Sequence, residues 1–256
     1  MVFVRQIGAF ILMAPIYWRL RAAIARPQRL GLHLFRGVTA IGAMTCGLTA
    51  VILIPLADAT AIQMAEVLFA TAFAAVFLRE VVSHRQWLAT VIGFVGVVIM
   101  IRPFSGGFET GGLIALAGAV CGALTMIALR MGAGHDRVET VTFWQGLMVL
   151  AVITPIALPF WVWPTAFEWK VLAAMSVAFT IGQWLFTAAM RLGETAAIAP
   201  LNYVRLIMMA GVGWALYAEV PTWPTVIGAV LIIGSATFTL RMNARARATP
   251  PASETT

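Results

Sequence analysis

Two ionisable side chains, Glu66 and Arg205, stand out because each lies near the middle of a long apolar run. A charged side chain at the centre of a membrane helix costs about 2.5–3.5 kcal/mol on insertion scales, so such residues are interpreted as functional. Each has an amide three residues earlier, Gln63 and Asn202, which a helix places on the same face. These four residues are therefore the first candidates for binding polar or charged groups of a solute.

Two interpretations of this charged pair stay open. If Glu66 and Arg205 face a cavity, they bind substrate, and Gln63, Asn202 and Tyr203 shape its selectivity. If they face each other, they form an interhelical ion pair that orients the helices and never touches substrate. The two interpretations overlap, because an ion pair can open to admit a ligand.

Polar–aromatic pairs in two further apolar runs form a second group of candidates. Trp144 and Gln145 lie in one run, and Gln183 and Trp184 lie in the next. Rings can stack on an aromatic solute and amides can hydrogen-bond it. The same residue types also fill the space between helices, so both substrate binding and packing remain possible roles.

The composition of the chain requires a membrane. Of its 256 residues, 61% are hydrophobic and 11% are charged, whereas a soluble domain carries about 25% charged residues. Apolar runs of about 15–22 residues recur, each long enough to cross a ~30 Å hydrocarbon core. We predict an all-α polytopic membrane protein with about nine transmembrane helices, over residues 3–20, 37–54, 59–78, 87–101, 111–129, 140–161, 170–190, 196–217 and 223–240.

The sequence does not favour an enzyme, a metalloprotein or a nucleic-acid-binding protein. It contains no GxSxG, HExxH or CxxC motif, and Cys46 and Cys121 lie inside apolar runs, far along the chain from the three histidines. The net charge of +7 comes from arginines in short segments between apolar runs, which form no basic domain. We expect no catalytic residues, no metal and no cofactor; the expected partners are a small-molecule substrate and membrane lipid.

The distribution of basic residues predicts the orientation. Counting connections alternately, two basic residues fall on one side, Arg102 and Lys170. Thirteen fall on the other: Arg19, Arg21, Arg26, Arg29, Arg36, Arg79, Arg85, Arg130, Arg137, Arg191, Arg241, Arg245 and Arg247. The positive-inside rule places the larger group in the cytoplasm, together with the C-terminus. Three tryptophans fall at an outer connection, as in an interfacial aromatic belt: Trp161, Trp163 and Trp169.

Two segments of the chain, 56–62 and 192–198, match weakly, and the similarity continues beyond them at an offset of about 135–139 residues. In the predicted orientation Asp58 lies outside, whereas its counterpart Glu194 lies inside, so the two copies are inverted. Glu66 and Arg205 are equivalent in this alignment, since 66 + 139 = 205. Inverted repeats are typical of secondary transporters, with the substrate site between them. Chance similarity between Ala-rich helices is the alternative.

These segments also carry a family resemblance. The first half resembles an EamA domain, the repeat unit of the drug/metabolite transporter superfamily, through Arg36-Gly37, 57–61, 78–80, Gln86-Trp87, 92–97 and Arg102-Pro103. The second half resembles the second copy through 199–203 and 218–221. The resemblance implies a first EamA repeat over 1–103, lacking its first helix, and an inverted second repeat over 104–240. The Pro, Ala, Ser and Thr of residues 241–256 predict a disordered cytoplasmic tail.

Members of that family have ten helices, so the nine spans here indicate the ten-helix EamA fold without its first helix. Either the reading frame begins upstream of Met1 or the chain is a shortened member. The resemblance implies a secondary transporter of a small organic metabolite that works by alternating access. It suggests an amino-acid derivative, a nucleoside-like compound such as S-adenosylmethionine, or a vitamin. Protons as the coupling ion and a homodimer as the assembly stay open, as does the alternative of a non-transporting scaffold or regulatory subunit.

The orientation is directly testable with topology reporters. A phosphatase that is active only in the periplasm should be inactive when fused after Thr256, and a cytoplasmic fluorescent reporter should be bright there. The matched control is a phosphatase fusion after Trp163, in an outer connection, which should be active. Phosphatase activity from the Thr256 fusion would overturn the predicted topology.

Overall fold

A computed structural model describes residues 2–25, 27–79, 82–101, 110–132, 136–191, 208–209, 211–216, 218 and 222–248. The regular secondary structure of these residues is helical, which confirms the predicted all-α class. Six of the described helices are long and apolar enough to cross a membrane, so the protein is a multi-pass membrane protein. Contacts divide the helices into two compact units, Met1–Ile41 with Ala128–Gly193, and Gly42–Ile127 with Glu194–Thr256.

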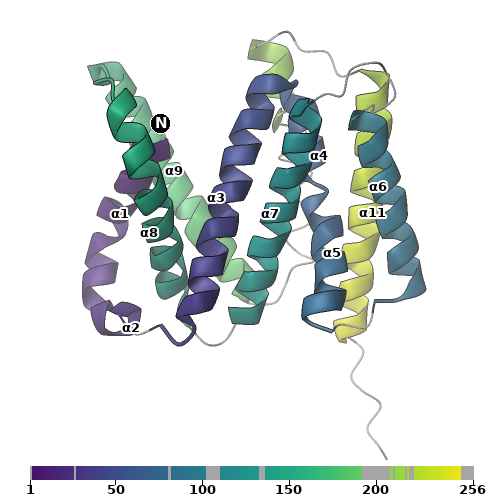
Figure 1. Cartoon of the computed structure of the whole chain (residues 1–256), viewed down its shortest axis with the longest axis horizontal. Coiled ribbons are helices and arrows are strands. Elements are labelled where there is room, and N and C mark those ends of the chain that lie inside the picture. The colour runs from purple at the N-terminus through teal and green to yellow at the C-terminus, as the bar shows by residue number, and fades with distance from the viewer. Residues whose placement is uncertain are drawn as a thin grey trace, which may run out of the picture. The chain divides into compact units, whose positions relative to one another are not determined.

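The first unit is built around α1, which packs along both α8 and α9 (Figure 1). Its elements are α1 (Val2–Arg19), α2 (Arg21–Ala25), the start of α3 (Leu30–Leu53), the end of α7 (Thr110–Gly132), α8 (Val138–Ala157), the 3₁₀ helix η1 (Leu158–Phe160) and α9 (Ala166–Arg191). Aromatic rings fill the space between α1 and α8. Phe143 meets Phe10 at 5.5 Å and Tyr17 at 5.0 Å between centroids, both edge to face, a favourable arrangement of ring quadrupoles.

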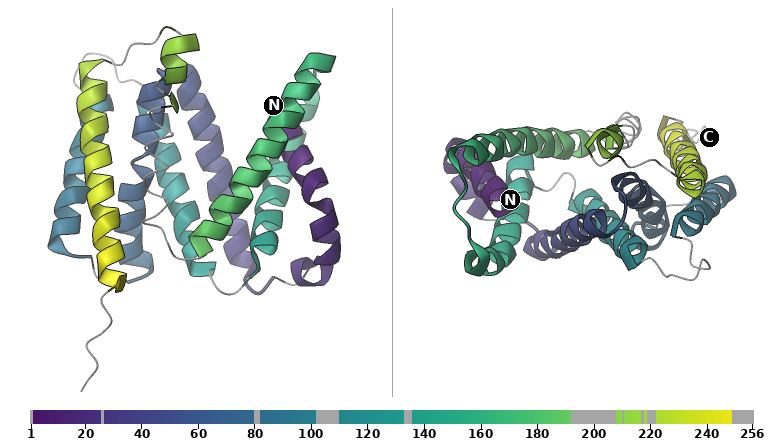
Figure 2. Two further views of the ribbon diagram at one scale, coloured as in Figure 1. Left: turned by 180° about the vertical axis from the view of Figure 1, so that it is seen from behind. Right: turned by 90° about the horizontal axis from the view of Figure 1, so that it is seen from above.

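The second unit contains the remainder of α3, α4 (Leu56–Gln63), α5 (Glu66–Phe77), α6 (His84–Ile101), most of α7 and α11 (Trp223–Ala248). Helices α6 and α11 lie side by side along most of their length (Figures 1 and 2). Glycines permit this approach. A Cβ atom on Gly96 would lie 2.8 Å from the carbonyl oxygen of Gly228, and one on Gly228 would lie 2.7 Å from that of Gly96. Small residues bring membrane helices close enough to gain van der Waals contact.

In the first unit, a helix–helix contact occurs twice, and the residues from the two halves of the chain change places in the second copy. Gly8 of α1 packs against Ser176 of α9, and Gly37 of α3 packs against Met148 of α8. Ser176 follows Gly37 by 139 residues and Met148 follows Gly8 by 140, close to the offset of about 135–139 residues in the predicted repeat. The α1–α9 contact therefore recurs as the α3–α8 contact, as expected of two repeats related by a two-fold axis.

The second unit shows the same exchange between α6 and α11. Gly93 of α6 packs against Ser235 of α11, and Met100 of α6 packs against Gly228 of α11. Gly228 follows Gly93 by 135 residues, and Ser235 follows Met100 by 135. Each compact unit thus draws on both halves of the sequence. The repeat boundaries at 103 and 104 stay a prediction, because compact units and sequence repeats divide the chain differently.

The span predicted over 59–78 is interrupted. The amide of Met64 bonds to the carbonyl of Ala61 at 3.1 Å, and that of Ala65 bonds to Ile62 at 3.0 Å. These bonds reach back three residues and tighten the turn between α4 and α5 into a 3₁₀ form. The interruption falls immediately before Glu66.

The C-terminal boundary needs a correction. The tail predicted to be disordered from residue 241 is helical as far as Ala248. Residues 241–248 are Arg, Met, Asn and Ala, and most of these are strong helix formers. Pro250 and Pro251, which disfavour helix, come only after Ala248. Residues 249–256 lie outside the described chain, as does most of the span predicted over 196–217.

The contact between α6 and α11 predicts the effect of a single methyl group. Gly228→Ala should lower the free energy of unfolding by about 1–3 kcal/mol, because the new Cβ meets a backbone oxygen that cannot move aside. Gly234→Ala is the matched control in the same helix, since a Cβ there meets nothing within 4 Å. Unfolding in detergent measures both variants. Equal stabilities for the two would contradict the close approach.

Candidate functional site

A polar network joins three helices inside the first unit. The buried guanidinium of Arg36, on α3, donates from Nη2 to Gln145 Oε1 of α8 at 2.5 Å and from Nη1 to the carbonyl oxygen of Val141 at 3.3 Å. Gln183 of α9 donates from Nε2 to the same Gln145 oxygen at 3.2 Å. The structure therefore brings the predicted residues Gln145 and Gln183 together, and adds Arg36.

Glycines beside the network let the helices approach. Gly37 follows Arg36 in the sequence, and a Cβ at Gly37 would lie 2.6 Å from Cβ of Met148. Gly146 follows Gln145, and a Cβ there would lie 2.7 Å from Nε2 of Gln6 on α1. Gly37 therefore lets α3 and α8 approach closely beside the hydrogen bond from Arg36 to Gln145, and Gly146 leaves room for the Gln6 side chain of α1.

The hydrogen bonding of Arg36 is incomplete in this conformation. Its side chain is 4% exposed, and its Nε atom is buried without a hydrogen-bond partner in the described part of the chain. No carboxylate lies within ion-pair distance of Arg36 among the residues that the structure describes. Burying a charge without a counter-charge costs several kcal/mol, even when neutral acceptors surround it.

A second polar cluster lies next to the network, at the N-terminal end of α3. His33 Nε2 lies 3.0 Å from Asp136 Oδ2, and the backbone amide of Gln28 donates to Asp136 Oδ1 at 3.2 Å. A space of about 10 Å³, room for about one water, is lined by side chains that include His33, Arg36 and Asp136. The span predicted over 37–54 leaves His33 outside a helix, but His33 lies in α3, because this helix begins at Leu30.

The two tryptophans of the second candidate group lie apart from this network. Trp144 donates from Nε1 to the carbonyl oxygen of Ile24, at the end of α2, at 3.0 Å, so its indole attaches α2 to α8. The side chain of Trp184 is 40% exposed. Neither forms a described hydrogen bond with Gln145 or Gln183, and substrate binding by the tryptophans stays a prediction.

The predicted charge Glu66 lies in the second unit. Its carboxyl group packs against Gly122 of α7, where a Cβ would lie 2.7 Å from Glu66 Oε2. The Gln63 amide packs against Gly47 of α3, with Nε2 3.3 Å from a Cβ built there. Both side chains therefore point at neighbouring helices. The predicted partners Asn202, Tyr203 and Arg205 lie outside the described residues, so the pairing of Glu66 with Arg205 stays a prediction.

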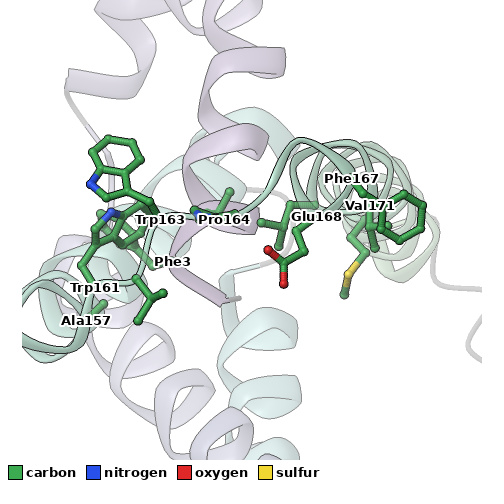
Figure 3. Close-up of a pocket in the computed structure, with 12 residues that line it drawn as sticks. Phe3, Ala157, Trp161, Trp163, Pro164, Phe167, Glu168 and Val171 are labelled. Atoms are coloured by element: carbon green, nitrogen blue, oxygen red, sulfur yellow. The ribbon is translucent and has the colours of Figure 1, made fainter.

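A cavity of about 550 Å³ lies at the other end of the first unit, lined by the start of α1, the end of α8 and the start of α9 (Figure 3). Figure 3 shows the Glu168 carboxylate between the ring of Phe167 and the rings of Phe3, Trp161 and Trp163. Glu168 also caps α9, accepting bonds from the backbone amide of Thr165 at 2.6 Å and from its hydroxyl at 2.9 Å. None of the predicted substrate residues lines this cavity.

The chain is similar over most of its length to known membrane transporters. It is 26% identical over 206 residues to an S-adenosylmethionine uptake transporter of Rickettsia prowazekii, covering 80% of this chain and 70% of that protein. It is 27% identical over 215 residues to a riboflavin transporter of Vibrio cholerae, covering 83% and 72%. It is 31% identical over 227 residues to the pseudopaline exporter CntI of Pseudomonas aeruginosa, covering 85% and 78%.

A solved crystal structure has the same fold, with a TM-score of 0.64 and 22% identity over 96% of this chain and 88% of its own. The model of the EamA-like transporter family matches residues 1–102 and 109–241, nearly the whole sequence. One relative, the CntI exporter, is 31% identical, and the match covers 78% of its length. Because of this similarity and the match to the family model, the chain belongs to the EamA-like transporter family.

Proposed function

We propose that this protein is a secondary transporter that moves a small organic metabolite across the bacterial inner membrane by alternating access, with its C-terminus in the cytoplasm. The observation that carries the proposal is the set of contacts exchanged between the two halves of the chain, Gly8–Ser176 with Met148–Gly37 and Gly93–Ser235 with Met100–Gly228. Transporters built from inverted repeats open to either side when one repeat rocks against the other.

The names of the relatives support a polar metabolite of moderate size as the substrate. They transport S-adenosylmethionine, riboflavin or pseudopaline. One of them is named for uptake and another for export, so the assay must measure transport in both directions. The proposed coupling ion is the proton. Membrane lipid surrounds the protein, and the proposed assembly is a homodimer.

The buried polar side chains favour a transporter over a scaffold or regulatory subunit. A scaffold in lipid gains nothing from a buried charge, whereas transporters use intramembrane polar residues along their substrate paths. The proposed substrate-binding residues are Gln63, Glu66, Trp144, Gln145, Gln183, Trp184, Asn202, Tyr203 and Arg205.

The function is tested with purified protein in proteoliposomes. Uptake and efflux of a metabolite panel, including S-adenosylmethionine, riboflavin and amino acids, should exceed that of protein-free vesicles for at least one compound. A pH gradient should change its rate if protons are coupled. Flux equal to the vesicle background for every compound, from protein shown to be folded, would favour a scaffold.

The same assay separates the two interpretations of Glu66 and Arg205. Removing one member of a buried ion pair costs about 3–5 kcal/mol, so the double swap Glu66→Arg with Arg205→Glu is the informative variant. We expect the swapped protein to fold but not to transport, because the charges that read the substrate are exchanged. Near wild-type transport per folded molecule would show that the pair is structural.

A further inference from the structure

We propose that Arg36 is the counter-charge for a carboxylate of the transported solute, so that substrates of this protein carry an anionic group. The inference rests on the proposed transport function and names the substrate class. It also adds Arg36 to the site, a residue that the sequence placed among the cytoplasmic arginines and among the segments that resemble the family.

The charge of Arg36 is not balanced by an ion pair among the described residues. Its guanidinium is bonded to two neutral acceptors, Gln145 Oε1 and the carbonyl of Val141. The acid that lines the same small space, Asp136, is already bonded to His33 and to the backbone amide of Gln28. Arginine keeps its charge at neutral pH, so this part of the first unit holds a buried positive charge without an ion-pair partner among the described residues.

Hydrogen-bond donors around Arg36 outnumber the described acceptors. Arg36 Nε is buried and has no described partner. Gln145 Oε1 already accepts the bonds from Arg36 and Gln183, which leaves the amino group of Gln145 to donate. A planar guanidinium beside amide donors matches a carboxylate, which accepts up to four hydrogen bonds and pairs with arginine through two parallel bonds.

A purely structural role for Arg36 would carry an unnecessary desolvation cost. If Arg36 only braced α3 against α8, a neutral donor such as glutamine could bond Gln145 without the desolvation cost of a charge. A buried cation in a membrane protein is therefore interpreted as a group awaiting a partner. Solute binding would supply that partner when the network opens, in a site whose glycine-lined helices are already in place.

The experiment compares carboxylic acids with their own methyl esters. The full chain in detergent and in proteoliposomes is given S-adenosylmethionine, methionine and other amino acids as probes, each paired with its methyl ester, and riboflavin as a probe without a carboxylate. In the wild type, acids should raise the melting temperature and be transported, whereas the esters should be weaker by about tenfold or more, as for ligands that lack a group the site was built to bond.

Two variants act on the charge in different ways. Arg36→Gln removes it and should abolish the preference for acid over ester. Gln145→Glu keeps Arg36 but places a carboxylate at the atom 2.5 Å from Nη2. This variant should melt at the same or a higher temperature and still lose at least about tenfold in acid uptake, because the internal carboxylate replaces that of the solute. Arg19→Gln, an exposed arginine at the end of α1, is the control and should behave as wild type.

The outcomes separate this inference from the proposed function. Acid-dependent stabilisation that disappears in Arg36→Gln, but without transport of any probe, would uphold the carboxylate site and overturn transport of these probes. Transport of riboflavin without stabilisation by any acid would uphold transport and overturn the inference. A folded Arg36→Gln or Gln145→Glu variant that still prefers acids to esters would also overturn it, since a residue that only braces the helices predicts that result.

Discussion

A guanidinium buried among membrane helices must take nearly all of its hydrogen bonds from the protein, or the charge stays partly unsatisfied. Arg36 is in that position, with two neutral acceptors and one buried N–H that has no described partner. This constraint explains the neighbouring features of the first unit. Gln145 lies where it can accept two bonds, and Gln183 extends the network to α9.

Polar side chains can meet only if the helices that carry them approach closely, and glycine makes that possible in both units. Gly37 and Gly146 lie next to the polar residues, and Gly96 and Gly228 bring α6 against α11. The Gly8–Ser176 contact recurs as Gly37–Met148, and the Gly93–Ser235 contact recurs as Gly228–Met100, so similar packing is used in both halves of the chain. A two-fold related pair of repeats provides two equivalent ways to pack, which is the physical basis of alternating access.

Hydropathy predicted the membrane class and most spans, because lipid imposes apolar runs of a fixed length. The family was predicted from the resemblance of particular segments to an EamA domain. The break between Met64 and Ala65 was not predictable, since neither glycine nor proline marks it. Gln145 and Gln183 could be selected as polar residues in apolar runs. Their partner Arg36 could not, because it lies 109 residues from Gln145 and a basic residue near the end of a span ordinarily indicates topology. The helix from 241 to 248 was missed because the Pro, Ala, Ser and Thr of residues 241–256 indicated a disordered tail, although the arginines and alanines before Pro250 favour helix.

Together, alternating access and substrate binding at Arg36 require the network of Arg36, Gln145 and Gln183 to lie on a path that opens to both sides of the membrane. The most direct measurement is the reactivity of Gln183→Cys, with Cys46 and Cys121 replaced by serine, toward a membrane-impermeant maleimide applied to right-side-out and to inside-out vesicles. Trp163→Cys, in an exposed connection, provides the one-sided control. Alternating access predicts that Gln183→Cys reacts from both sides, whereas Trp163→Cys reacts from the outer side. Reaction of Gln183→Cys from one side only, or from neither, would contradict alternating access at this network.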